Sequence, residues 1–213
     1  MKFRIVTLIS LLAFMGALLP NHAQGQKQQV IRFKTQVKPN SDERINLVMT
    51  PKVGEKGVQI DGCELVKLDK GEAWKVTKSW ITITGPVTQF DCNLSAIDSI
   101  TFENPESLQE LIVETNKMSV LNLTGMKSLT YLGASATDIR EINLTGCTSL
   151  KQIQCNGSKL VKINLTAATN LEKASLTLSS LSELDLTGLT KLKELDLNNN
   201  GISKIDLKNL PAL

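Results

Sequence analysis

Residues 192–212 read LKELDLNNNGISKIDLKNLPA, and this 21-residue stretch is one unit of the repeat that decides the fold. Six such units follow one another, and they begin at Val87, Leu108, Leu129, Leu150, Leu171 and Leu192. In all six units, positions 1, 4, 6, 11, 14 and 16 are apolar. Because a single coil of this length cannot bury its own leucines, the repeat predicts stacked coils that share a continuous core.

Each unit contains two L-x-x-L-x-L stretches, and each stretch is typical of a short strand that points alternate side chains inward. We therefore predict a mostly β fold, a leucine-rich-repeat solenoid with two parallel strand ladders on opposite sides of a thin coil and little or no helix. Unit position 9 is a short polar residue, expected to bond buried backbone groups, and position 18 favours residues that tolerate tight turns. The second ladder is expected to stack Asn122, Asn143, Asn164, Asp185 and Asp206 on its outer face.

The segment before the repeats, residues 24–86, lacks the period. It contains short alternating runs at 30–34, 45–49, 57–60, 74–76 and 80–83. These runs predict about five strands in a small β-sandwich-like module that precedes the solenoid of residues 87–213. Both tryptophans, Trp74 and Trp80, lie close to the junction. We favour the interpretation that they cover the open end of the first coil, with sugar stacking as the alternative.

Residues 1–23 have the layout of a secretory signal peptide. A basic start with Lys2 and Arg4 precedes an apolar stretch from Ile5 to Leu19, and a polar break follows. The apolar stretch is shorter than the roughly 20 residues that a membrane-spanning helix needs. We therefore predict a secreted chain without a transmembrane segment in its mature part, and leave attachment to the cell surface open.

Charge and histidine content exclude several functions. Removal of residues 1–23 takes Lys2 and Arg4 from the 24 basic residues, so 22 face 21 acidic ones and the net charge is +1. A near-neutral chain lacks the electrostatic footprint of a nucleic-acid-binding protein. The single histidine, His22, leaves with the same segment, which excludes a Ser-His-Asp or Cys-His relay and a His-ligated zinc. We predict no catalytic residue, no metal and no cofactor.

The four cysteines contain no C-x-x-C pair of the kind that binds metals. Cys92 and Cys155 both hold unit position 6, three coils apart. At roughly 4.8 Å per coil they lie outside disulfide reach, so we predict two buried free thiols in place of leucine. Cys147 is expected to be packed as well, and Cys63 has no assigned role.

The nested unit of residues 192–212 resembles the class of bacterial leucine-rich repeats called IRREKO. The junction WITITGPVTQFDCNLSAIDSITF, residues 80–102, resembles the start of the repeat array in secreted internalin-like proteins of anaerobic bacteria. This resemblance covers residues 81–213 and implies a secreted or cell-surface protein used in adhesion and partner recognition, with no specific ligand. The chain departs from the pattern at unit position 9, where Ser or Thr often replaces the usual Asn.

The outward positions 3, 5 and 7 of the main ladder form an extended face of the kind that solenoids use for recognition. Tyr131 beside Ile112 is the exposed apolar anchor that the sequence identifies there, and aromatic anchors tend to dominate binding energy. A solvated sheet face with two incidental apolar residues is the alternative. The predicted binding residues are Glu110, Ile112, Glu114, Tyr131, Gln152, Gln154, Asn156, Lys173, Glu194 and Asp196.

Three further features of the sequence have more than one interpretation. Acid pairs such as Glu194 with Asp196 could bind a cation or act on glycosides, but a flat face without a cleft disfavours an enzyme. The Asn-Leu-Thr triplets match the N-glycosylation pattern, but the repeat phase explains them as a stacked ladder. Leu213 opens a seventh coil without a polar cap, which predicts either a fragment of a longer protein or end-to-end association through the last repeat.

Taken together, these features predict a non-catalytic secreted or cell-surface module that presents a rigid repeat surface to a protein or glycan ligand. A structural spacer that displays a further domain is the first alternative. An exported glycan-active enzyme is the second, and the missing histidine and cleft disfavour it.

Overall fold

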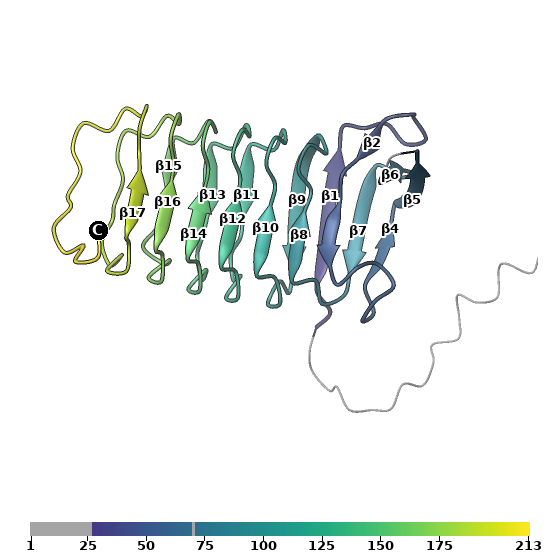
Figure 1. The fold of residues 1–213 in the computed structure, drawn as a ribbon, viewed down its shortest axis with the longest axis horizontal. Helices are drawn as coiled ribbons and strands as arrows, with labels where there is room; N and C mark the ends of the chain where they lie inside the picture. Colours follow the sequence, from purple (N-terminus) through teal and green to yellow (C-terminus); the bar gives the residue numbers. More distant parts are fainter. Residues whose placement is uncertain (1–26, 70) are drawn as a thin grey trace, which may run out of the picture.

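The computed structural model describes residues 27–69 and 71–213, so the predicted signal peptide lies outside the described residues. These residues form an elongated all-β coil whose turns stack along one axis toward the C-terminus (Figure 1). The predicted leucine-rich-repeat solenoid is confirmed, and no helix is present in the described part of the chain. That part accordingly holds no helix long and apolar enough to cross a membrane.

The main ladder is a sheet of six parallel strands, one from each repeat unit, and we number the coils 1 to 6 from residue 87 onward. Its strands are β8 (Gln89–Asp91), β10 (Glu110–Ile112), β12 (Tyr131–Gly133), β14 (Gln152–Gln154), β16 (Lys173–Ser175) and β17 (Glu194–Asp196). Each residue pairs with the residue 21 positions later, as Glu110 pairs with Tyr131. Because the register equals the repeat length, equivalent side chains form straight rows along the sheet.

The second ladder lies on the opposite side of the coil and is shorter than predicted. Its parallel strands are β11 (Val120–Asn122), β13 (Glu141–Asn143) and β15 (Lys162–Ile163), with β9 (Ile97–Glu103) beside β11. Residues 183–185 and 204–206 form no strand. The predicted outer residues are exposed there, but each side-chain oxygen accepts the backbone N–H two residues later rather than a bond from a neighbouring coil. These residues are Asn122, Asn143, Asn164, Asp185 and Asp206.

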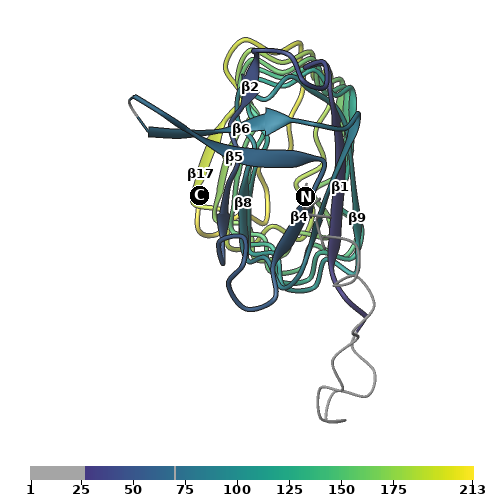
Figure 2. The same ribbon diagram turned by 90° about the vertical axis from the view of Figure 1, so that its right-hand side faces the viewer.

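The N-terminal strands are antiparallel and continue both sides of the solenoid. One sheet has the order β4-β7-β1-β9, with β4 (Gln59–Asp61), β7 (Trp80–Thr84) and β1 (Val30–Thr35). On the other side, β3 (Val48–Thr50) pairs with β8 at the edge of the main ladder. A third sheet contains β2 (Arg44–Ile45), β6 (Gly71–Val76) and β5 (Cys63–Leu68), and its β5–β6 hairpin extends beyond the outline of the coil (Figure 2). Sheet hydrogen bonds therefore cross the predicted boundary at residue 86.

The two tryptophans have different surroundings. Trp74 is half-buried against the core, and its indole Nε1 donates a hydrogen bond to the carbonyl oxygen of Leu47 at 3.0 Å. Trp80 is 40% exposed. Its neighbour Ile81 is fully buried, so the alternation of β7 turns Trp80 outward. The prediction that both tryptophans cover the first coil is therefore wrong for Trp80.

The core runs without a break from the N-terminal sheets through coil 5. All the repeat's apolar positions in coils 1 to 5 are buried except Phe102, which is half-buried. Of these positions in coil 6, Leu192 alone is buried, and Leu207 is 51% exposed. The four cysteines are buried free thiols, which confirms the prediction for Cys92, Cys147 and Cys155 and adds Cys63.

Unit position 9 stabilises the inner turns, as predicted, and its asparagines also join coils. Asn116 Nδ2 donates to the carbonyl oxygen of Cys92 in coil 1 at 2.9 Å, and Asn116 Oδ1 accepts the N–H of Ile97 at 2.8 Å. Ser158, in contrast, donates to the carbonyl oxygen of Cys155 three residues earlier in its own coil. Hydroxyls at this position reach a neighbouring coil as well, because Ser179 Oγ donates to the carbonyl oxygen of Cys155 at 3.3 Å, but the longer amide of Asn116 makes more of these bonds.

Tight turns repeat at two unit positions. Position 8 adopts a left-handed conformation in every coil, with φ between 53° and 64°, although leucine holds it in coils 1 and 5. Position 18 is also left-handed in all coils except the fourth, which has Ala167 there. The prediction that position 18 forms a tight turn is confirmed, and position 8 was not identified from the sequence.

Candidate binding surface on the main ladder

The main-ladder face is the outward side of the six parallel strands, and it contains all ten predicted binding residues. Eight of them lie on strands β10 to β17, while Glu114 and Asn156 lie two residues beyond their strands. The register aligns Glu110, Tyr131, Gln152, Lys173 and Glu194 in one row. A second row contains Ile112, Gly133, Gln154, Ser175 and Asp196. The structure thus brings the predicted residues together, and their role in binding stays a prediction.

Tyr131 is held in place by its own strand and by the next coil. A Cβ atom on Gly133 would lie 3.2 Å from the Tyr131 hydroxyl oxygen and 3.3 Å from its Cε1, so the ring lies over the bare glycine backbone. The hydroxyl donates a hydrogen bond to Gln154 Oε1 at 2.9 Å. Burial, and then the nearby Glu114 carboxylate, raises the pKa of Tyr131. The chain's only tyrosine is therefore a half-buried, oriented anchor at the centre of the face.

Carboxylates gather beside this anchor in coils 1 and 2. Asp91 pairs in register with Ile112, and Glu110 pairs with Tyr131. Glu114 Oε1 lies 3.2 Å from the position of a Cβ atom on Gly133, beside the Tyr131 ring. The ion pairs among the described residues involve none of these three carboxylates. This half of the face is acidic and carries no cation of its own.

The C-terminal half of the face is a shallow depression of about 480 Å³. Its polar lining consists of Gln152, Gln154, Lys173, Ser175, Glu194 and Asp196. Here one of the two carboxylates has a cation beside it, because Lys173 Nζ lies 2.7 Å from Glu194 Oε1. Five of the six polar lining residues were predicted from the sequence, and Ser175 was not.

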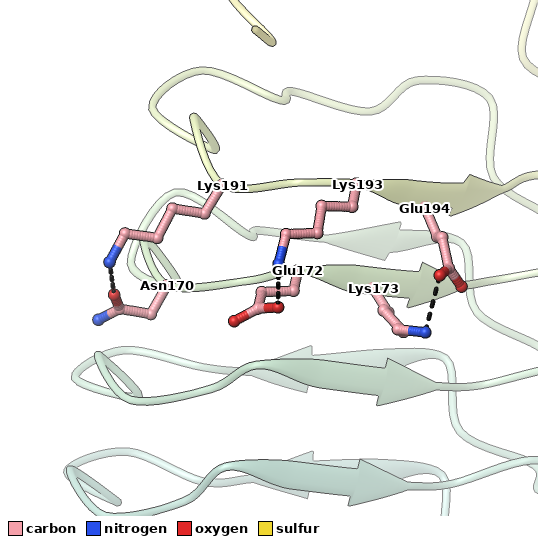
Figure 3. A network of polar contacts seen from close by, with 6 residues as sticks. All are labelled: Asn170, Glu172, Lys173, Lys191, Lys193 and Glu194. Atoms are coloured by element: carbon pink, nitrogen blue, oxygen red, sulfur yellow. Dashed lines mark hydrogen bonds and ion pairs between the residues drawn. The ribbon is translucent and has the colours of Figure 1, made fainter. Parts of the chain in front are cut away.

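Three polar pairs join adjacent coils near this depression, and Figure 3 shows them side by side. Two of them join coil 5 to coil 6, and the third, between Asn170 and Lys191, joins coil 4 to coil 5. Besides the Lys173 pair, Lys191 Nζ donates to Asn170 Oδ1 at 2.6 Å and Lys193 Nζ donates to Glu172 Oε2 at 2.7 Å. The hydrogen bond from Lys193 and its charge lower the pKa of Glu172. The two residues of each pair are 21 positions apart and hold the same unit position in adjacent coils. The pairs therefore favour the same register as the backbone hydrogen bonds.

The Asn156 side-chain oxygen is bonded to the next coil. Its Oδ1 accepts hydrogen bonds from Ser175 Oγ at 2.8 Å, from the Thr177 N–H at 3.0 Å and from Thr177 Oγ1 at 3.0 Å. A carbonyl oxygen with three donors has no acceptor capacity left for a ligand. Sequence reasoning missed this because the donors come from the following coil.

Three exposed apolar residues beside the face were also missed. Val48 on β3 is 57% exposed and pairs in register with Asp91, so it extends the outward row by one strand. Leu94 and Leu178, at unit position 8, are 66% and 62% exposed just past the main strands. The exposure of the two leucines could have been predicted from the sequence, because unit position 8 is not one of the repeat's apolar core positions.

The acid pair Glu194 and Asp196 offers little for catalysis. Glu194 is paired with Lys173, and Asp196 Oδ1 accepts hydrogen bonds from Asn198 N at 3.1 Å and Asn198 Nδ2 at 2.7 Å. Across residues 27–69 and 71–213, no group of three or more His, Cys, Asp or Glu residues is placed to hold a metal ion.

Comparisons with known proteins add a likeness of fold. No protein-family model matches the chain, and no curated protein matches it. Among solved structures, the chain is similar to one described as the functional domain of InlJ from Listeria monocytogenes, which includes a cysteine ladder. The TM-score is 0.48 and the sequence identity 22% over 59% of this chain. The match spans only 33% of that protein's chain, and the cysteine ladder is a feature of that protein.

Proposed function

We propose that the chain is a non-catalytic binding module that uses the main-ladder face to recognise a protein partner outside the cell. The observation that carries this proposal is the Tyr131 ring, fixed over Gly133 and bonded to Gln154 at the centre of an in-register sheet. Immobilised aromatic rings lose little entropy when they bind, and rigid solenoid faces suit extended contacts. The layout of residues 1–23 supports export.

The surroundings of the exposed Trp80 ring favour a protein partner over a glycan. The Arg32 guanidinium lies over the Trp80 ring, 5.4 Å from its centroid. A sugar that stacked on this side of Trp80 would have to displace that cation. The main-ladder face, in contrast, combines an aromatic anchor, Ile112 and polar rows, which is the composition of a protein interface.

The proposal is tested by selecting peptides from a displayed random library on the immobilised chain. Selected peptides are then measured against the Ile112→Ala/Tyr131→Ala double variant. The matched control is Val120→Ala/Val161→Ala, because these valines are 58% and 47% exposed on the opposite side of the coil. Urea unfolding verifies that both variants remain folded.

We expect the face variant to weaken peptide binding at least tenfold and the control variant to leave it unchanged. Two truncated anchors of this kind typically cost more than about 1.4 kcal/mol, which corresponds to that factor. Peptides that bind the wild type and both variants equally would refute the proposal and favour a structural spacer.

A further inference from the structure

We infer that the face takes an arginine side chain of its partner at the acidic half, defined as Asp91, Glu110, Ile112, Glu114, Tyr131 and Gly133. The guanidinium would lie on the Tyr131 ring within reach of the Glu110 and Glu114 carboxylates. This inference rests on the proposed function and specifies the partner's chemistry at the same face.

The first argument is the contrast in charge between the two halves of one sheet. In coils 5 and 6 the face contains a lysine, and Lys173 pairs with Glu194 at 2.7 Å, which leaves Asp196 as the carboxylate without an ion pair there. In coils 1 and 2, Asp91, Glu110 and Glu114 have no ion-pair partner among the described residues. Asp91 and Glu110 are diagonal neighbours on adjacent strands, at a spacing of roughly 7–8 Å, where long like-charged side chains can repel one another. A partner's cation would remove that repulsion, so charge complementarity favours a basic segment.

The second argument is the shape around Gly133. The missing side chain lets the Tyr131 ring and the Glu114 carboxylate pack closely over the Gly133 backbone, each with an oxygen 3.2 Å from the position of a Cβ atom, so the ring and the carboxylate lie side by side. Ile112 pairs with Gly133 in register and borders the same spot from the neighbouring strand. An aromatic ring, a carboxylate and an aliphatic side chain therefore surround one stretch of bare backbone.

Arginine is the side chain that uses all three of these groups. Its planar guanidinium stacks on aromatic rings and forms two parallel hydrogen bonds with a carboxylate. Its apolar stem can pack against Ile112 while the charge stays near Glu110 and Glu114. Lysine offers a compact charge without the planar fork, so it would use the carboxylates but gain less from the ring.

The test uses Tyr131 as its own reporter. Because the chain contains a single tyrosine, ¹³C-labelled tyrosine gives one set of ring signals. Acetylated and amidated hexaarginine, hexalysine and hexaglutamine are titrated into the chain at constant ionic strength. We expect hexaarginine to shift the ring signals, hexalysine to bind several-fold more weakly, and hexaglutamine to have no effect.

Two variants with equal loss of charge separate the site from general electrostatics. Glu110→Gln/Glu114→Gln is expected to weaken hexaarginine binding at least tenfold. The control Glu141→Gln/Glu183→Gln removes two exposed carboxylates outside the main-ladder face and should change it less than twofold. Equal losses in both variants, or equal binding of hexalysine, would overturn the inference.

The outcome also separates this inference from the proposed function. Displayed peptides that require Tyr131 and Ile112 but lack arginine would leave the proposed function intact and overturn the arginine assignment. Peptides that ignore the face altogether would overturn both.

Discussion

Replacing Asn116 by alanine should destabilise the solenoid more than any comparable change at the same unit position. The Asn116 side chain makes four hydrogen bonds to backbone groups that are buried or nearly so. Its Oδ1 accepts the Ile97 N–H at 2.8 Å, and its Nδ2 contacts the carbonyl oxygens of Cys92 at 2.9 Å, Val113 at 2.9 Å and Glu114 at 3.1 Å. Two of these four groups belong to coil 1 and two to coil 2.

The magnitude follows from the groups that would lose their partner. Alanine would leave the Ile97 N–H buried without an acceptor and would remove the side-chain donor from three carbonyl oxygens. Stranding a buried polar group costs about 1–3 kcal/mol, and a carbonyl oxygen with a remaining partner costs less. We therefore expect Asn116→Ala to lower the free energy of unfolding by about 3–5 kcal/mol. Ser158→Ala removes one donor, to Cys155, and a shared contact with Ser179, so about 1 kcal/mol is expected.

Urea unfolding followed by circular dichroism measures both variants. The midpoint should move far more for Asn116→Ala, while the denaturant slope should stay the same if both variants unfold from the same compact state. Equal destabilisation by the two substitutions would show that asparagine at position 9 acts only within its own coil. That result would refute the reasoning.

Three further outcomes are expected. Leu178 is 62% exposed and has a left-handed φ of 53°, a conformation that is strained for leucine but not for glycine. Leu178→Gly should therefore raise the free energy of unfolding in urea by about 0.5–1 kcal/mol. A lower free energy of unfolding would contradict this account of strain. Gly146 has φ 84°, and a Cβ atom there would lie 3.3 Å from the Gly125 backbone. Gly146→Ala should therefore lower the free energy of unfolding by about 1–3 kcal/mol. Ala167→Gly, at the same unit position in the next coil, should lower it by at most about 1 kcal/mol. Burial raises the pKa of Cys63 and Cys155 to about 12 and that of Cys147 to about 11, and it raises the pKa of Cys92 as well. At pH 8 a thiol reagent should therefore label the native chain far more slowly than the urea-unfolded chain. Unfolded thiols ionise near pH 8.5, so the unfolded chain loses these protons before the folded chain does. The free energy of unfolding should therefore fall as the pH rises from about 9 toward 12. Rapid labelling of all four thiols in the native chain would contradict their burial.

The sequence predicts the repeat part of the fold because its information is periodic. Once each unit pairs with the next at an offset of 21 residues, the rows of the main ladder follow, and so does the placement of Tyr131 in line with Glu110 and Gln152. The N-terminal sheets carry no such period. Val30 pairs with Glu103 across more than seventy positions, and nothing in the alternation of residues 30–34 selects that partner.

The features that the sequence did not predict at single residues have local physical causes. Trp80 was judged by residue type, although the buried Ile81 and Ile83 on the same strand turn it outward. Asn156 looked available because its three donors lie in or beside the next coil's strand. The Tyr131 site depends on the absence of a side chain at Gly133, and a missing side chain leaves little trace in a pattern of apolar positions.

The N-terminal cap has a second consequence for the face, because β3 does more than close an edge. An open edge at β8 would expose unpaired N–H and C=O groups to other chains. Antiparallel pairing of β3 satisfies those groups and places Val48 opposite Asp91 and Thr50 opposite Gln89. Val48 therefore joins the row of Asp91 and Ile112, which lengthens the acidic half by an exposed apolar residue. Because the same strand closes the solenoid and extends the face, a substitution that detaches β3 should weaken binding at Tyr131 together with stability.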